Sequence, residues 1–362
     1  MRAILTGQVG VDKGPYLEAA REMARAAGHD LHICHVGKMM YAEAPDVPAG
    51  RILNLPINRL NALRRAVFKE IQRFAEQHEH VLVNTHATFR WRHGLFAAFD
   101  FDQIKAFNAD VYLTLVDNVE SVHQRLLRDH DIDHTLKDIM VWREEELLAT
   151  EILAKILRGW GHFFMLSRGR RELTIRTIYR LLFEPWRKKA YLSFPMSHVM
   201  DLPNILEQIE AFKGSMNEHL ICFDPADVDE LLLHTLALRH LQEGQTTLRV
   251  DGPLGPLMLK TQDVAQISGD IMGQTYARDF KMIDQSDMIV SLVPQLPNGK
   301  PALSSGVERE LQHAYENAKE VYIIWKCSAT PSPFITETAT RIFSSVEDAA
   351  EFLAGGSSPL AL

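Results

Sequence analysis

Short apolar runs alternate with amphipathic segments along the first half of the chain. The runs predict strands at residues 3–6, 31–36, 81–83, 111–116 and 163–166. Residues 15–27 have the periodicity of a helix that ends at Gly28. A second helix is predicted where Leu60, Leu63, Val67, Ile71 and Phe74 recur three and four residues apart. Strands that alternate with helices indicate a parallel sheet covered on both faces.

The alternation begins again after a basic helical stretch at residues 170–189. Further strands are predicted at residues 190–194, 219–223, 288–293 and 321–325, and helices at 203–212, 228–242, 308–317 and 346–353. Two apolar runs about a Gly-Pro-rich turn predict a hairpin at residues 246–261, inserted into this second region. We therefore predict two α/β domains, at residues 1–187 and 188–355.

The composition is that of a globular protein and narrows the classes of function. The 362 residues are 46% hydrophobic and 24% charged, which suits two domains of ordinary size. A net charge of -8 argues against a dedicated binder of nucleic acid or of anionic membranes, because both need positive surface. Three scattered cysteines, the lack of a secretory signal and the lack of an apolar run of roughly 18 residues favour a cytoplasmic protein.

The turn after the first predicted strand, GQVGVDKG at residues 7–14, lies where a phosphate-binding loop of the form G-x-x-x-x-G-K-[ST] belongs. Gly7, Gly10 and Lys13 are its candidate nucleotide-binding residues. Asp12 stands where the second glycine is expected, and it places an anion beside the phosphates. Gly14 stands where a Ser or Thr would bind Mg²⁺, so the loop lacks that metal ligand.

Residues 1–170 resemble the archaeal-type adenylate kinases, P-loop nucleotide kinases whose third strand ends in Asp-Thr-His. Here that strand ends in Asn84-Thr85-His86, with a neutral residue in place of the acid. The resemblance implies a lid at residues 125–138, in which Arg125 and Arg128 would contact a nucleotide.

Phosphoryl transfer depends on electrostatic positioning, so these departures predict a degenerate kinase domain. It would bind ATP or another nucleotide, or be purely structural; the alternative is an active nucleoside monophosphate kinase. The acids and histidines of residues 129–134 are interpreted as a solvated turn, and no metal is expected.

In the second region the stretch LSSGVERELQHA, residues 303–314, leads from a Ser-Ser-Gly turn into a helix. The free N–H groups at a helix N-terminus would let Ser304, Ser305 and Gly306 hold a phosphate. Glu310 lies on this helix and Asp279 lies upstream of it. Tyr191 and Ser193 lie on the first strand of the region, whose C-terminal end is where open α/β sheets bind ligands.

These separated motifs resemble the nucleoside 2-deoxyribosyltransferase superfamily, and most closely its 2′-deoxynucleoside 5′-monophosphate N-glycosidases. The resemblance covers residues 189–327 and implies a flavodoxin-like or Rossmann-like domain after the P-loop kinase-like one. It implies Glu310 as the nucleophile, Asp279 as the group that orients the substrate or protonates the base, and Tyr191 as a positioning group. Ser304, where the transferases usually have Asp, favours a 5′-phosphate, which Ser305, Gly306 and Ser193 would help to hold.

The sequence therefore predicts an enzyme that hydrolyses the N-glycosidic bond of a nucleotide, with no cofactor needed for the cleavage. Alternatives are deoxyribosyl transfer between bases, cleavage of NAD⁺, and a non-catalytic nucleotide-binding regulatory protein. The partners expected are small-molecule nucleotides rather than nucleic acid or membrane. The second resemblance also implies a homo-oligomer, at least a dimer, because neighbouring subunits complete the pocket in that family.

Overall fold

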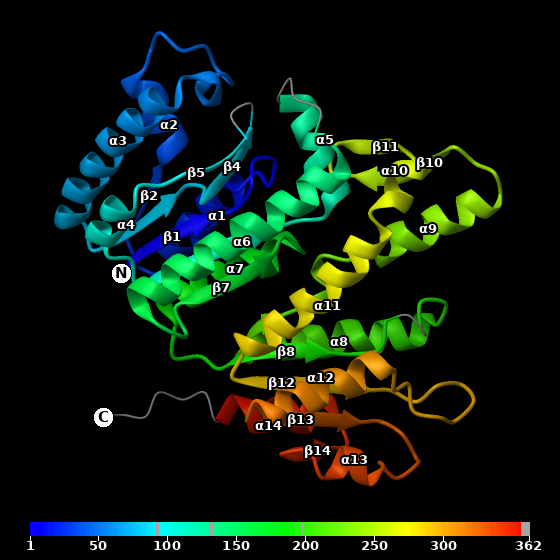
Figure 1. Ribbon diagram of the computed structural model, residues 1–362. Coiled ribbons are helices and arrows are strands. Elements are labelled where there is room, and N and C mark those ends of the chain that lie inside the picture. The colour runs from blue at the N-terminus through cyan, green and yellow to red at the C-terminus, as the bar shows by residue number, and fades with distance from the viewer. Residues whose placement is uncertain (92–93, 130–133, 197–198, 356–362) are drawn as a thin grey trace. The chain divides into compact units, whose positions relative to one another are not determined.

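The computed structural model describes residues 1–91, 94–129, 134–196 and 199–355. The chain divides into two compact units (Figure 1). The first unit comprises Met1–Leu182 and Val228–Thr275, and the second comprises Phe183–Asp227 and the chain from Tyr276 onward. Within the described ranges, no helix is both long enough and apolar enough to cross a membrane.

The first unit contains a parallel five-stranded sheet of order β2-β3-β1-β6-β7, which confirms the predicted α/β class. Its strands are β1 (Arg2–Thr6), β2 (Leu31–His35), β3 (His80–Asn84), β6 (Val111–Val116) and β7 (Phe163–Ser167). The five predicted strands are thereby confirmed. All six residues of β6 are buried, as expected of a strand with neighbours on both sides and helices on both faces.

Seven helices accompany this sheet within the described residues of the first half of the chain. They are α1 (Gly14–Ala26), α2 (Val36–Glu43), α3 (Ile57–Gln77), α4 (Phe101–Phe107), α5 (Val119–Asp129), α6 (Leu136–Arg158) and α7 (Arg171–Phe183). A capping box starts α6, because the Thr135 and Asp138 side chains each bond the backbone N–H of the other. A short antiparallel pair, β4 (Thr88–Trp91) and β5 (Gly94–Ala97), follows β3 and was not predicted.

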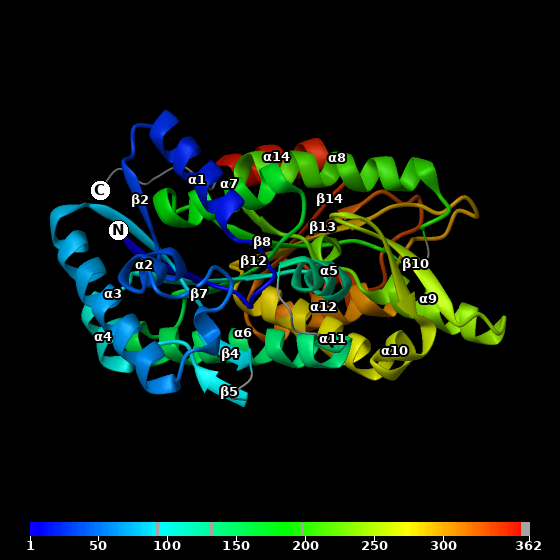
Figure 2. The same cartoon turned by 90° about the horizontal axis from the view of Figure 1, so that it is seen from above.

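Residues 228–275 return to the first unit from the second half of the chain. They form α9 (Leu231–Gln242), the hairpin of β10 (Thr247–Gly252) and β11 (Gly255–Lys260), α10 (Thr261–Gln266) and the beginning of α11 (Ser268–Asp284). The hairpin itself was predicted, but we expected it in the second domain. It lies beside α5 (Figures 1 and 2), where the Gln124 side chain donates to the Gly255 carbonyl and accepts from the Leu254 N–H.

The second unit contains a parallel sheet of order β14-β13-β12-β8-β9. Its strands are β8 (Lys189–Ser193), β9 (Ile221–Phe223), β12 (Met288–Val293), β13 (Glu320–Trp325) and β14 (Arg341–Phe343), of which β14 was not predicted. The helices after β8 are α8 (Pro203–His219), α12 (Ser305–Glu316), α13 (Pro333–Thr336) and α14 (Val346–Gly355), besides the second half of α11.

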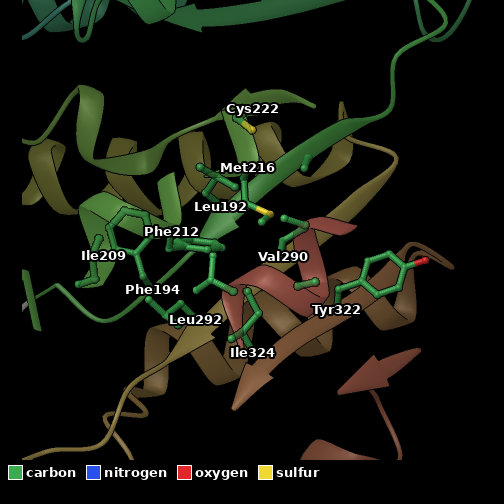
Figure 3. Packing of buried hydrophobic residues seen from close by; sticks show 14 of the residues in the cluster. Leu192, Phe194, Ile209, Phe212, Met216, Cys222, Val290, Leu292, Tyr322 and Ile324 are labelled. Atoms are coloured by element: carbon green, nitrogen blue, oxygen red, sulfur yellow. The ribbon is translucent and has the colours of Figure 1, made fainter. Parts of the chain in front are cut away.

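Alternation along β8 sends its side chains to two different faces of the sheet. Ala190, Leu192 and Phe194 join a hydrophobic cluster that includes residues of α8 and α14 (Figure 3). Successive side chains of a strand point to opposite faces of the sheet, so Tyr191 and Ser193 face the other side. That side is covered by α12, which packs on β12 and β13.

Candidate functional site

The topology of the second unit defines where a ligand would bind. β8 comes first in this sheet, with β9 on one side of it and β12 on the other. The chain therefore reverses its direction of winding at the border between β8 and β12. In open α/β sheets, the crevice beyond the carboxyl ends of the strands at such a reversal is the usual ligand site.

Glu310 is anchored to the C-terminal half of β8. The Tyr191 hydroxyl donates to Glu310 Oε1 at 2.8 Å, and the Ser193 hydroxyl donates to Oε2 at 2.6 Å. Glu310 reaches them because it lies on the buried side of α12, next in the helical repeat to Val307, Leu311 and Ala314. Thus the structure brings together three residues predicted from motifs that are more than a hundred positions apart.

Burial dominates the electrostatics of this group. Desolvation raises the pKa of Glu310 to about 7, against the lowering effect of the hydrogen bonds from Ser193 and Tyr191, and the negative charge of Asp279 adds to the rise. Desolvation, together with the adjacent Glu310, also raises the pKa of Tyr191 well above its usual value. The phenol is therefore a neutral donor at physiological pH, and Glu310 is poised near its midpoint.

The residues predicted to hold a substrate phosphate lie on β8 and at the N-terminus of α12. Ser304 is the N-cap of α12, and its hydroxyl oxygen accepts the Val307 N–H at 3.2 Å. The N–H groups of Ser305 and Gly306 occupy the first two positions of this helix, where no intrahelical acceptor is available. The Ser305 side chain lines a hollow between α12 and α13 together with Arg309. Ser193 donates to Glu310, and its contact with a phosphate stays a prediction.

In the phosphate loop of the first unit, the Lys13 side chain bonds to the backbone of the loop itself. The Lys13 ammonium donates to the Gly7 carbonyl at 2.5 Å and lies 3.4 Å from His86 Nδ1. Burial lowers the pKa of Lys13 to about 8, although the nearby Glu146 opposes that shift. Asp12 has a φ of 57°, the left-handed conformation that the glycine expected there would adopt without strain.

Glu146, a buried carboxylate on α6, contacts the first residue of the phosphate loop. Its oxygens accept four hydrogen bonds, from the N–H groups of Gly7, Ala87 and Thr88 and from the Thr88 hydroxyl, at 2.6–3.0 Å. The first N–H of the phosphate loop therefore already has an anionic partner within the protein. Sequence reasoning missed Glu146 because it stands in an acidic run, Glu144-Glu145-Glu146, that is typical of a solvated helix face.

The two arginines predicted to contact a nucleotide have protein partners. Arg125 is buried, and its Nη1 donates to Asp117 Oδ2 at 2.7 Å and to the Gly10 carbonyl at 2.9 Å. Arg128 is exposed and pairs with the neighbouring Asp129. Arg125 thus braces the loop, and its contact with a nucleotide stays a prediction. Of the predicted lid tip, residues 130–133 lie outside the described part of the chain.

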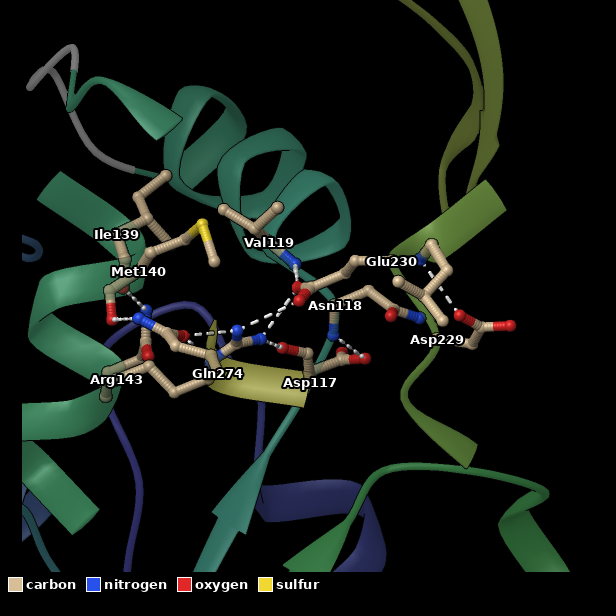
Figure 4. Close-up of polar contacts among 11 residues, drawn as sticks. Asp117, Asn118, Val119, Ile139, Met140, Arg143, Asp229, Glu230 and Gln274 are labelled. Atoms are coloured by element: carbon tan, nitrogen blue, oxygen red, sulfur yellow. Dashed lines mark hydrogen bonds and ion pairs between the residues drawn. The ribbon is translucent and has the colours of Figure 1, made fainter. Parts of the chain in front are cut away.

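Buried charged residues join the returning segment, residues 228–275, to helices α5 and α6 (Figure 4). Arg143 on α6 donates to both carboxylate oxygens of Glu230, at 2.7 and 2.9 Å, and Glu230 also accepts the Val119 N–H at the start of α5. Arg143 is 4% exposed and Glu230 is fully buried. Burial raises the pKa of the adjacent Asp117 to about 7, against the influence of Arg168.

A cavity of about 470 Å³ opens beside the phosphate loop. Its wall combines loop residues with apolar side chains of α2 and of β4, among them Met40, Tyr41 and Phe89. Arg64 reaches it from α3; its side chain is 2% exposed, its Nη1 donates to Asn61 and to the Ala97 carbonyl, and its Nη2 has no hydrogen-bond partner among the described residues. The signal in the sequence was an arginine on the apolar stripe of a helix, four residues after Leu60.

Among the residues that the structure describes, no group of three or more His, Cys, Asp or Glu side chains is placed to hold a metal ion. The predicted cluster at residues 129–134 lies mostly outside those residues, so this statement does not extend to it.

Comparisons with a family model and with curated proteins both match the first half of the chain. Residues 6–143 match a family model described as "AAA domain". Adenylate kinases of Pyrococcus furiosus and Pyrococcus abyssi are each 26% identical over 151 residues, which is 40% of this chain and 74% of theirs. The N-terminal part of this chain is therefore a P-loop kinase-like domain.

Solved structures align with about half of the chain. A shikimate kinase from Bacteroides thetaiotaomicron aligns with 50% of this chain and 98% of its own, at 14% identity and a TM-score of 0.33. A gluconokinase from Sinorhizobium meliloti 1021 aligns with 51% of this chain and 95% of its own, at 14% identity and a TM-score of 0.31.

Proposed function

We propose that the second unit cleaves the N-glycosidic bond of a nucleotide, most suitably a 2′-deoxynucleoside 5′-monophosphate. The observation that carries the proposal is the Glu310 carboxylate, held by the Tyr191 and Ser193 hydroxyls at the reversal point of the sheet. Cleavage of this bond develops positive charge at the anomeric carbon, and two donors that each fix one oxygen aim an anion at a single place.

The proposed reaction has two steps. Glu310 attacks the anomeric carbon, the N-glycosidic bond breaks with its electron pair passing to the base, and the base leaves with a proton from Asp279 or from water. Water then attacks the same carbon and passes one proton to the group that protonated the base, either Asp279 or the hydroxide left from water. This step releases the sugar phosphate and restores the Glu310 carboxylate. The free N–H groups at the start of α12, with the Ser304 hydroxyl proton, supply neutral donors for the 5′-phosphate.

The function is tested by incubating the full-length protein with deoxyribo- and ribonucleoside monophosphates, the parent nucleosides and NAD⁺. We expect free base from a deoxynucleoside monophosphate, detected by chromatography. A second free base added to the reaction distinguishes hydrolysis, which yields sugar phosphate, from transfer, which yields a new nucleotide. Release of no base from any of these compounds would reject the proposal.

The rate of base release is expected to rise with pH through about 7 and then level off. Glu310 must be ionised to attack, and burial raises its pKa to about 7, so protonation at lower pH removes the nucleophile. The high pKa of Tyr191 keeps the phenol protonated across this range. The measurement is kcat/KM between pH 5 and 9, because this ratio reports the ionisation of the free enzyme. A rate that falls as pH rises through 7 would instead assign Glu310 as a general acid.

A second proposed function concerns the first unit, which we infer binds a nucleotide without transferring its phosphate. The cavity beside the loop supports binding, because the buried Nη2 of Arg64 can donate to an anionic group. The inward-turned Lys13 and the carboxylate of Asp12 argue against transfer.

Arg64→Met is expected to weaken the binding of AMP by about tenfold or more, the usual effect of losing a charge-assisted hydrogen bond. The matched control is Arg65→Met, because Arg65 is exposed and pairs with Asp100. Isothermal titration calorimetry of both variants measures the effect. Equal AMP affinities in the two variants would exclude Arg64 as the ligand's partner.

Asp12→Gly is expected to tighten ATP binding about tenfold, because it removes a negative charge from the phosphate loop. Glycine also adopts the left-handed conformation that Asp12 has here, so the loop keeps its shape. The change is measured by calorimetry without added metal. Unchanged affinity for ATP would mean that the loop does not approach phosphate groups.

A further inference from the structure

Hydrogen bonds connect the phosphate loop to the interior of the first unit. The Gly10 carbonyl accepts from Arg125 Nη1, and the same nitrogen donates to Asp117 Oδ2. A parallel connection starts at Asp12, which lies 3.7 Å from Arg168 Nη2, while Arg168 Nη1 donates to Asp117 Oδ2 at 3.0 Å. Two residues of the loop are therefore tied to one buried carboxylate.

The same network reaches α11. Arg143 Nη1 donates to the Asp117 carbonyl at 3.0 Å, and Arg143 Nη2 donates to the Gln274 side chain at 2.6 Å. Gln274 in turn donates to the Met140 carbonyl on α6 at 3.2 Å, and Glu230 fixes Arg143 from the other side (Figure 4). All these contacts lie within the first unit.

Helix α11 belongs to both units. Residues 268–275 are part of the first unit and residues 276–284 part of the second. Asp279, the predicted substrate-orienting residue, follows Gln274 by five positions, about 7.5 Å along the helix axis. A helix is a stiff hydrogen-bonded rod, so a shift or rotation at Gln274 also displaces Asp279.

A ligand at the phosphate loop must disturb the first link of this network. To meet a phosphate, Lys13 has to leave the Gly7 carbonyl, and the loop has to turn N–H groups outward where the Gly10 carbonyl now accepts from Arg125. The bound and free loops therefore differ in their bonds to Arg125. Two such states, linked through buried polar contacts, are what coupling between distant sites requires.

We propose that a nucleotide bound at the phosphate loop controls the site of the second unit, through Arg125, Asp117, Arg143 and Gln274 to the Asp279 end of α11. That this control acts on base release rests on the proposed function. The connection between the phosphate loop and residues 276–284 does not depend on it. The nucleotide is an effector rather than a phosphate donor. Gln274 is a positioning residue, which acts through the helix that carries Asp279.

Hydrogen–deuterium exchange of the full-length protein tests the link without using its activity. Added ATP, without metal, is expected to change the exchange rate of amides 276–284 by about fivefold or more, the usual size of coupling between sites. Gln274→Ala is expected to reduce that change to less than about twofold, while calorimetry shows that ATP still binds. Gln274→Met, which keeps the length of the side chain without its acceptor, gives the same result if the Ala variant is unstable.

The matched control is Gln124→Ala. Gln124 also joins α5 to residues 228–275, through Gly255 and Leu254. It takes no part in the hydrogen bonds that run from Gly10 to Gln274. This variant is expected to keep the full response to ATP. The link is overturned if ATP does not bind, if exchange at 276–284 does not change, or if both glutamine variants respond alike. If exchange responds but no nucleotide releases base, the link stands and the proposed function fails.

Discussion

Replacing Glu310 by Gln is expected to lower the rate of base release by at least about a thousandfold, the usual cost of removing a nucleophile. The amide cannot form the glycosyl ester, yet its oxygen can still accept a hydrogen bond from Tyr191 or Ser193. The fold is therefore preserved while the chemistry is lost. The measurement is free base formed per enzyme from the deoxynucleoside monophosphate that the wild type cleaves.

The control is Glu308→Gln, on the same helix two residues earlier and exposed to solvent. It is expected to change the rate by no more than about twofold, since exposed charges contribute little. Equal losses in the two variants would show that a negative charge on α12 is needed, rather than this nucleophile. Full activity in Glu310→Gln would remove Glu310 from the reaction.

The same substitution should also alter the pH dependence of stability. The pKa of Glu310 is raised to about 7 in the folded protein, so the folded state holds its proton more tightly than the unfolded state. Ionised Glu310 therefore destabilises the fold progressively as pH rises from about 4.5 to above 7. Glu310→Gln is accordingly expected to raise Tm at pH 8 but not at pH 4.

Breaking the buried pair of Arg143 and Glu230 is expected to have the largest effect on stability. Arg143→Met leaves the carboxylate of Glu230 buried without its charged partner, at a cost of about 3–5 kcal/mol. Glu230 is fully buried, so solvent cannot compensate for the lost guanidinium. Urea unfolding followed by circular dichroism measures the change.

Two comparisons make this result specific to the buried pair. Lys137→Met removes an exposed pair with Asp270 that also joins α6 to α11, and it should cost less than about 1 kcal/mol. The double variant Arg143→Met/Glu230→Leu should recover much of the lost stability, because no uncompensated charge remains. A single variant as stable as the wild type would mean that water reaches Glu230.

The sequence predicted the strands of both sheets well because buried parallel strands are short apolar runs bounded by turns. Tyr191, Ser193 and Glu310 could be placed together because each lies at a position that the α/β topology sends to one edge of the sheet. The sequence pattern could not identify the hydrogen-bond partner of Ser193. A hydroxyl suits a phosphate or a carboxylate equally, and only the three-dimensional arrangement decides between them.

Long-range polar pairs could not be predicted from the sequence. Arg125 was predicted to contact a nucleotide because arginines in a lid usually face phosphates, and nothing in the pattern showed that it also donates to Asp117 and to the Gly10 carbonyl. Similarly, residues 228–275 read as part of the second domain because they are embedded in its sequence. Among the contacts that hold them in the first unit is the pair of Glu230 and Arg143, which are 87 positions apart.

The return of residues 228–275 sets the order in which this protein can be completed during synthesis. When the ribosome has made residues 1–187, Arg143 has no carboxylate from Glu230 to meet, and the start of α5 lacks its acceptor. The nascent first unit therefore cannot form this buried pair until the chain has passed through part of the second unit and come back. Cutting the gene at one point cannot separate the two units intact, because each unit is made of two stretches of the chain: Met1–Leu182 with Val228–Thr275, and Phe183–Asp227 with the chain from Tyr276 onward.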